Sequence, residues 1–99
     1  MIYSFDIDGT LCTNTDGDYE NAKPIQARIA RVNAEYEAGH QVILYTARRS
    51  TTGIDWRAIT EKQLSKWCLK YHSMYFAKPM ADIYIDDKAV NLTDWFHQP

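Results

Sequence analysis

Short apolar runs of strand length recur along the chain. Ile2 to Ile7 is mostly apolar and predicts the first strand. Gln41 to Thr46 (QVILYT) is a nearly continuous apolar run, which is typical of a parallel strand covered on both faces. Two shorter runs, Met74 to Ala77 and Ile83 to Ile85, predict two more short buried strands. The hydrophobic pattern therefore predicts four strands.

Apolar residues spaced three or four positions apart predict two helices between these strands. The first helix follows Pro24, which suits a first helical position, and Gly39 ends it. The apolar face of this helix contains Ile25, Ile29, Val32 and Tyr36. The second helix is expected to start near Asp55 as N-cap and to run to about Tyr71. The residues that the second helix would bury are Ile59, Leu64, Trp67 and Tyr71.

Two smaller features complete the pattern. Asp16-Gly17, at the centre of the stretch from Asn14 to Glu20, predicts a hairpin, because Asp-Gly readily takes the positive φ angles of a tight turn. A last turn of helix is expected over Leu92 to Phe96. The chain has no repeats or linker-like runs, so residues 1–99 are expected to form one domain. The order of the elements predicts a three-layer α/β fold with a parallel sheet.

Polar residues of chemical interest stand at the ends of the predicted strands. Sheets of this type bind ligands at the carboxyl ends of their strands. The residues expected to converge there are Asp6 and Asp8, Thr46 with Arg48, Lys78, and Asp86 with Asp87. Four carboxylates in one small cleft repel one another unless a cation binds or their pKa values rise strongly. An oxygen-only site suits magnesium, which keeps waters and shares a substrate phosphate.

The other side chains in this set suit phosphoryl transfer. Lys78 and the Thr46 hydroxyl would stabilise the oxygens of a transferring phosphoryl group. A carboxylate free of the metal can attack phosphorus to form an aspartyl-phosphate, while its neighbour two residues on manages the proton. Arg48 is either a surface charge on a loop or a substrate contact, since a guanidinium suits phosphate or the polar groups of a sugar.

These residues, in this order, resemble the haloacid dehalogenase superfamily of phosphotransferases. The four motifs of that family are matched by Asp6-Ile7-Asp8-Gly9-Thr10-Leu11, by Thr46 at the end of an apolar strand, by Lys78 before Pro79, and by Asp86-Asp87. The resemblance covers nearly the whole chain and implies a Rossmann-like core. Stretches such as TGIDWR and KPMADIYIDDKAV are also similar to small phosphatases associated with capsule and surface-polysaccharide biosynthesis.

The resemblance implies a role for each matched carboxylate. Asp6 would be the nucleophile that attacks phosphorus. Asp8 would be the general acid and base, with its backbone carbonyl on the metal. Asp86 would bind magnesium directly, and Asp87 directly or through a water. The implied metal-binding set is therefore Asp6, Asp8, Asp86 and Asp87.

The resemblance also assigns the remaining matched residues. Thr46 and Lys78 would hold the phosphoryl oxygens, with Lys78 also orienting Asp6. Gly9 would allow the tight turn after the first strand and, with Thr10, would lie at the substrate. The hairpin around Asp16-Gly17 resembles the flap that family members place over the site.

The two loops where family members insert a cap domain, residues 11–23 and 46–78, are too short to hold one here. The chain thus resembles the capless members, which cover the cleft by oligomerisation or accept large substrates. The implied activity is hydrolysis of a small phosphorylated substrate such as a sugar phosphate. A homo-oligomer follows as an expectation from the same resemblance.

Composition and charge argue against some classes of binding partner. The net charge of −2 and the pI near 5.8 lack the basic balance typical of nucleic-acid-binding proteins. No run approaches the roughly 20 apolar residues of a membrane span, and the N-terminus lacks a secretory leader, so no membrane partner is expected. Cys12 and Cys68 have neither CxxC nor zinc-site spacing and are interpreted as reduced thiols, consistent with a cytoplasmic location.

Two other functions remain as alternatives. A phosphatase for polynucleotide ends would need a cationic track beside an open cleft. Lys62, Lys66 and Lys70 recur along one face of the second predicted helix, but the overall charge is acidic. A non-catalytic phospho-acceptor module of the receiver type also combines aspartates, a hydroxyl, a lysine and magnesium. A receiver places its phosphorylated aspartate on a middle strand, whereas the middle strand here ends in Thr46.

Overall fold

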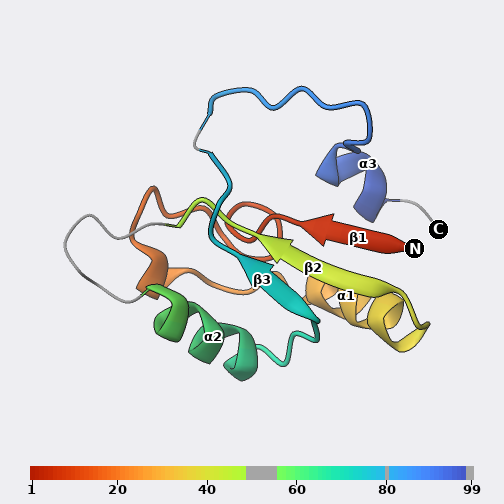
Figure 1. Cartoon of the computed structure of the whole chain (residues 1–99). Helices are drawn as coiled ribbons and strands as arrows, with labels where there is room; N and C mark the ends of the chain where they lie inside the picture. The colour runs from red at the N-terminus through yellow and green to blue at the C-terminus, as the bar shows by residue number, and fades with distance from the viewer. Residues whose placement is uncertain (49–55, 80, 98–99) are drawn as a thin grey trace.

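The computed structural model describes residues 1–48, 56–79 and 81–97. Within them, three strands form one parallel sheet in the order β1-β2-β3 (Figure 1). The strands are β1 (Ile2–Phe5), β2 (Gln41–Tyr45) and β3 (Ser73–Tyr75). The helices are α1 (Gln26–Glu37), α2 (Trp56–Lys66), α3 (Leu92–Phe96) and the 3₁₀ helix η1 (Tyr19–Asn21). The predicted α/β class with a parallel sheet is confirmed, and none of the helices described is long and apolar enough to cross a membrane.

One face of the sheet carries the hydrophobic core. The parallel register places Phe5 beside Leu44, and Leu44 beside Met74. Because neighbouring residues in register point to the same side of a sheet, these three side chains share one face. The core is built from Phe5, Val42, Leu44 and Met74 of the sheet, Ile29 and Val32 of α1, and Leu64 of α2.

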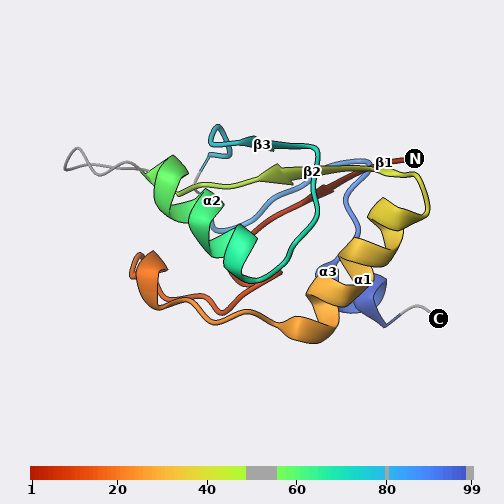
Figure 2. The same ribbon diagram turned by 90° about the horizontal axis from the view of Figure 1, so that it is seen from below.

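All three α-helices lie on the same side of the sheet (Figure 2). The Trp95 ring of α3 packs edge-on against Phe5 with centroids 5.2 Å apart, and the Arg31 guanidinium of α1 lies 4.4 Å from the centroid of that Trp95 ring. The opposite face presents Ile2 and Tyr75, which are 68% and 52% exposed, and no helix of the described residues covers it. The described residues therefore form two layers, whereas three were predicted.

The two main helices end in the same way, although only one end was predicted correctly. Gly39, with φ +92°, follows the C-terminus of α1 as predicted. Cys68 adopts φ +59° after α2, and the Leu69 and Cys68 N–H groups donate to the carbonyls of Leu64 and Ser65. This hydrogen-bond pattern stops α2 at Lys66 rather than near Tyr71.

The two main helices also begin at particular points. α1 starts at Gln26 with Ile25 as N-cap, two residues after Pro24. α2 starts at Trp56, and its predicted N-cap, Asp55, lies outside the described residues. The short terminal helix forms over the predicted range, with the Asn91 side chain accepting a hydrogen bond from the Thr93 N–H at 2.9 Å.

The strand predicted over Ile83 to Ile85 does not form. Residues 81–90, called the arm below, are all exposed, and Ile83 and Ile85 are 75% and 93% exposed. The arm runs between β3 and α3 outside the sheet (Figure 1). An alternating apolar segment becomes a strand only where a neighbouring strand completes its hydrogen bonds, and the described residues supply none to the arm.

The segment that joins β1 to α1 forms a closed loop, called the flap below (residues 11–25). Asp16 and Gly17 have φ angles of 53° and 102°, so the predicted tight turn is confirmed. The base of the flap is held by backbone hydrogen bonds. The Thr13 N–H donates to the Lys23 carbonyl and the Ile25 N–H donates to the Leu11 carbonyl, both at 2.9 Å.

Candidate active site

A cleft of about 380 Å³ lies beyond the carboxyl ends of the three strands. Its lining residues are Asp6 and Asp8 after β1, Asn14, Asp16, Gly17 and Tyr19 from the flap, Ala47 and Arg48 after β2, Lys78 after β3, and Tyr84 from the arm. The structure thus brings together predicted site residues from all three strand ends. Their convergence follows from the parallel sheet, in which all carboxyl ends share one edge.

Asp6 is the carboxylate closest to the end of β1. Its Oδ1 accepts a hydrogen bond from the Ile7 backbone N–H at 2.9 Å, and its Oδ2 lies 3.3 Å from Lys78 Nζ. Lys78 is held beside the end of β2, because its backbone N–H donates to the carbonyl of Thr46, the residue that follows β2, at 3.3 Å. Burial raises the pKa of Asp6, and the nearby Lys78 charge lowers it by less. Asp6 is therefore a partly desolvated carboxylate that further positive charge would stabilise.

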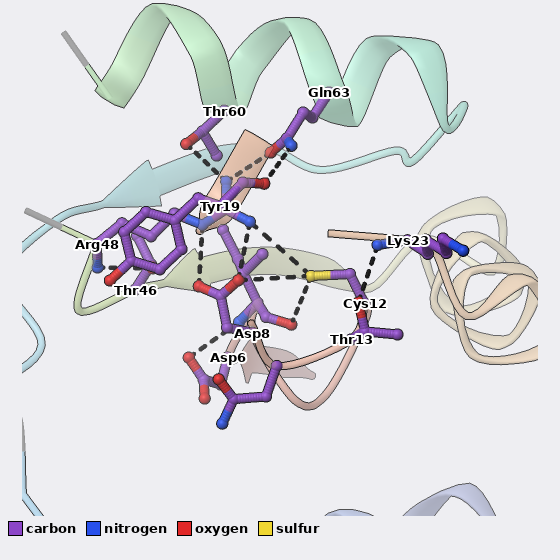
Figure 3. A network of polar contacts seen from close by, with 12 residues as sticks. Asp6, Asp8, Cys12, Thr13, Tyr19, Lys23, Thr46, Arg48, Thr60 and Gln63 are labelled. Carbon is purple, nitrogen blue, oxygen red and sulfur yellow. Dashed lines mark hydrogen bonds and ion pairs between the residues drawn. The ribbon is translucent and has the colours of Figure 1, made fainter. Parts of the chain in front are cut away.

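The Asp8 carboxylate is held by two hydrogen bonds from the Arg48 guanidinium (Figure 3). Arg48 Nε donates to Asp8 Oδ2 and Arg48 Nη2 donates to Asp8 Oδ1, both at 2.9 Å. Two parallel hydrogen bonds of this kind fix the plane of the carboxylate as well as its position. Arg48 stands in the wall of the cleft with only 1% of its surface exposed.

The rest of the Arg48 guanidinium is also fully engaged. Nη1 donates to Thr60 Oγ1 at 3.0 Å and to Gln63 Oε1 at 2.6 Å, and Nη2 reaches Cys12 Sγ at 3.8 Å. A guanidinium has five N–H donors, and these contacts use all of them. The interpretation of Arg48 as a surface charge is therefore wrong, whereas its contact with a substrate stays a prediction.

Three residues of this network were not found by sequence reasoning. Cys12 is buried and lies 3.6 Å from Asp8 Oδ1, and burial, with the Asp8 charge, raises the pKa of its thiol to about 12. Cys12 is therefore a neutral thiol in the folded protein. Thr60 and Gln63 lie three positions apart and so share one face of α2 with buried Leu64. Polar residues on an otherwise apolar helix face were the signal that could have revealed them.

Three other predicted residues shape the strand ends through hydrogen bonds and backbone conformation. Thr46 is fully buried, and its Oγ1 accepts the Arg48 backbone N–H at 3.1 Å. Gly9 has φ +80°, which explains why glycine suits the tight turn. The carbonyls of Gly9 and Thr10 accept hydrogen bonds from Arg28 Nη1 at 3.3 and 3.1 Å. The phosphoryl-binding and substrate-binding roles of these residues stay predictions.

The structure does not bring Asp86 and Asp87 to the other carboxylates. Both lie in the exposed arm, where Asp86 Oδ1 accepts the Lys88 N–H at 2.8 Å, a hydrogen bond that lowers the pKa of Asp86. Across residues 1–48, 56–79 and 81–97, no group of three or more His, Cys, Asp or Glu side chains could hold a metal ion. The expected four-carboxylate cluster is absent there because the arm stays outside the sheet. Tyr84 is the arm residue at the cleft, with Lys78 Nζ 4.3 Å from its ring centroid.

The three lysines considered for the alternative function, a phosphatase for polynucleotide ends, are exposed. Lys62 and Lys66 lie on α2, and Lys70 follows it. Lys70 forms an ion pair with Glu37 of α1, so part of this positive charge is neutralised within the protein. The structure thus adds no support for a cationic track beside the cleft.

Comparison with known proteins supports the fold. No family model matches the chain, and no curated protein matches it. Among solved structures, the chain is similar to the crystal structure of a target protein from Vibrio cholerae, with a TM-score of 0.87 and 26% sequence identity. The match covers 99% of this chain and 89% of that chain. The name of that protein gives no activity.

Proposed function

We propose that the chain is a magnesium-dependent phosphatase that hydrolyses small phosphomonoesters, such as sugar phosphates, through an aspartyl-phosphate on Asp6. This is the activity of the haloacid dehalogenase superfamily that the sequence resembles. The observation that carries the proposal is the placement of Asp6 beside Lys78 in a cleft that also holds Asp8. The cleft volume of about 380 Å³ suits a small ligand.

In the first step, an Asp6 carboxylate oxygen attacks phosphorus and forms a new phosphorus–oxygen bond. The bond between phosphorus and the ester oxygen breaks, and that oxygen takes a proton carried by Asp8 as the alcohol leaves, which gives Asp8 as the carboxylate that pairs with Arg48. Lys78 Nζ, 3.3 Å from Asp6 Oδ2, offsets the negative charge of the phosphoryl oxygens.

In the second step, a water attacks the phosphorus of the aspartyl-phosphate. The Asp8 carboxylate takes a proton from this water, and the bond between phosphorus and the Asp6 oxygen breaks. Inorganic phosphate leaves, Asp6 is again a carboxylate and Asp8 is again protonated. Both carboxyl groups thus return to their starting states.

Magnesium suits the oxygen donors of this site. It commonly takes one or two carboxylates and completes its shell with waters and a substrate phosphate. The Asp6 carboxylate and the Asp8 main-chain carbonyl would hold it, because the Asp8 carboxylate is occupied by Arg48. When bound, magnesium supplies positive charge that offsets the phosphate and the desolvated Asp6 carboxylate. Asp86 and Asp87 would join only if the arm moved toward the cleft.

An assay of an aryl phosphate with and without magnesium tests this proposal. We expect turnover by the natural chain only with magnesium, loss of turnover in Asp6→Asn, and normal turnover in the control Asp94→Asn. Asp94 is a matched control because it is an exposed aspartate on α3 outside the cleft. Equal activity of Asp6→Asn and the natural chain, or a folded natural chain that is inactive on all phosphomonoesters tried, would contradict the proposal.

A further inference from the structure

We propose that Arg48 is a positioning residue that holds the Asp8 carboxyl group in the orientation needed for proton transfer. Gln63 connects the Arg48 side chain to the flap. The inference rests on the proposed function, since it concerns how Asp8 is made ready for proton transfer. It assigns Arg48 a role different from the substrate contact considered from the sequence.

The first step of the argument is the rigidity of the Arg48 side chain. Its guanidinium is held from two directions, by Asp8 and Cys12 on one side and by Thr60 and Gln63 of α2 on the other (Figure 3). A rotation of the Asp8 carboxylate would break both of its hydrogen bonds to Arg48. The orientation of Asp8 is therefore set by where α2 holds the guanidinium.

The second step is the position of Gln63 between Arg48 and the flap. Gln63 Oε1 accepts from Arg48 Nη1, and Gln63 Nε2 donates to the Tyr19 carbonyl, both at 2.6 Å. Only one orientation of the amide makes both hydrogen bonds, because the oxygen must face the guanidinium and the nitrogen must face the carbonyl. Gln63 thus connects Arg48, which holds Asp8, to helix η1 of the flap.

The third step is a direct contact between the flap and Arg48. The Arg48 guanidinium carbon lies 4.9 Å from the Tyr19 ring centroid, and the same ring packs edge-on against Trp56 of α2 at 4.9 Å. Tyr19 also lines the cleft. A flap that lifts would break the Gln63 hydrogen bond and withdraw this ring from the guanidinium. A flap that keeps these contacts with Gln63 and Arg48 and a fixed orientation of the Asp8 carboxylate therefore occur together.

A series of aryl phosphates with increasingly poor leaving groups tests the inference. Proton donation by Asp8 matters most when the leaving oxygen is basic, so a misplaced Asp8 makes kcat fall more steeply along the series. Arg48→Lys keeps the charge and loses the paired hydrogen bonds. Gln63→Glu keeps an acceptor for Arg48 and loses the donor to Tyr19. Gln26→Glu makes the same chemical change at an exposed position of α1 and serves as control.

We expect Arg48→Lys to lower kcat by about tenfold or more for the poorest leaving group and much less for the best one, with little change in KM. Gln63→Glu should steepen the series in the same direction, and Gln26→Glu should follow the natural chain. Because Gln63→Glu removes the link between Arg48 and the flap but keeps the Arg48 side chain, it provides the test if Arg48→Lys does not fold.

The outcomes separate this inference from the proposed function. Variants that are folded and active but show the unchanged slope of the natural chain would overturn the positioning role alone. A higher KM for every substrate with an unchanged slope would also overturn it, because that pattern indicates a substrate contact. A natural chain that hydrolyses no member of the series would overturn the proposed function, and the inference with it.

Discussion

The Arg48 guanidinium is a charge buried at the junction of a strand end and a helix. A buried charge is tolerated when it is paired and hydrogen-bonded, and Arg48 meets both conditions through Asp8 and its polar neighbours. Asp8 depends equally on Arg48, because no other cation is within ion-pair distance of it among the described residues. The pair should therefore behave as one unit when either partner is removed.

We expect Arg48→Met to destabilise the fold by about 3–5 kcal/mol, since it leaves the Asp8 carboxylate uncompensated. The double variant Arg48→Met with Asp8→Asn should recover part of that loss, because the orphaned charge is gone. Urea unfolding of the natural chain, both single variants and the double variant measures the coupling. Strictly additive losses would show that the two side chains are energetically independent.

Asp6→Asn should raise the stability of the protein at neutral pH. The pKa of Asp6 is raised by burial, so the folded state holds this proton more tightly than the unfolded chain. The corresponding stabilisation is present below the unfolded pKa and is lost as the pH rises through the folded pKa. At pH 7 the natural chain carries the full cost of the charge, which asparagine removes.

Thermal unfolding in the presence of a chelator checks this prediction. The Tm of Asp6→Asn should exceed that of the natural chain at pH 7, and the difference should shrink as the pH falls toward the unfolded pKa. Asp94→Asn, which changes an exposed carboxylate, should show no such gain. A lower Tm for Asp6→Asn at pH 7 would mean that the Lys78 ion pair outweighs desolvation.

For individual residues, the sequence predicted which side chains lie close together. It predicted less well which hydrogen bonds and ion pairs these side chains form. Asp6, Asp8 and Lys78 could be placed together because each follows a strand of one parallel sheet. The partners of Arg48 could not, because they depend on which face α2 turns toward the sheet. Thr60 and Gln63 reach the guanidinium only through that packing.

Among the elements, α1 and α2 are each followed, two residues after the helix ends, by a residue with positive φ, but only α1 is followed by glycine. Gly39 has φ +92° and Cys68 has φ +59°. A side chain in this left-handed region is strained, so the two sites should respond in opposite directions to the exchange of glycine and a side chain.

Gly39→Ala should lower the stability by about 1 kcal/mol, and Cys68→Gly should raise it by up to about the same amount. Neither residue lines the cleft, so the proposed phosphatase activity should be the same in both variants as in the natural chain. Urea unfolding gives the two values. Changes of the same sign would contradict the expected strain at Cys68.

The helix ends also show where sequence patterns lose information. Glycine marked the end of α1 in advance, because only glycine adopts positive φ without cost. Cysteine is not a residue type that marks helix ends, so the sequence gives no sign that α2 stops before Cys68. The spacing of apolar residues therefore extended the predicted helix to Tyr71. The Asp16-Gly17 turn was predictable for the same reason as Gly39, since both of its residues favour positive φ.

At the scale of the whole molecule, two apolar surfaces remain uncovered by the described residues. One is the sheet face with Ile2 and Tyr75, and the other is the arm with Ile83 and Ile85. Exposed apolar patches of this kind are typical of interaction sites. The arm was predicted to be a buried strand because its pattern is apolar, but a pattern does not show which surface covers it.

We expect copies of the chain to associate, as the resemblance to capless phosphatases implies. Light scattering after gel filtration should give a mass above that of one chain at micromolar concentration. Ile83→Asp combined with Ile85→Asp should shift the protein toward the monomer, while the exposed control Lys62→Asp should not. A monomeric natural chain under these conditions would contradict the prediction.

The burial of Cys12 allows the opening of the site to be followed by chemical modification of its thiol. The thiolate is the reactive form of cysteine, and the Cys12 thiol has a pKa raised to about 12, whereas Cys68 is exposed. An alkylating reagent should therefore modify Cys68 at once and Cys12 only when the flap and Arg48 move apart. The rate of the second modification would then report how often the site opens, and a bound phosphate analogue that keeps the flap seated would slow it.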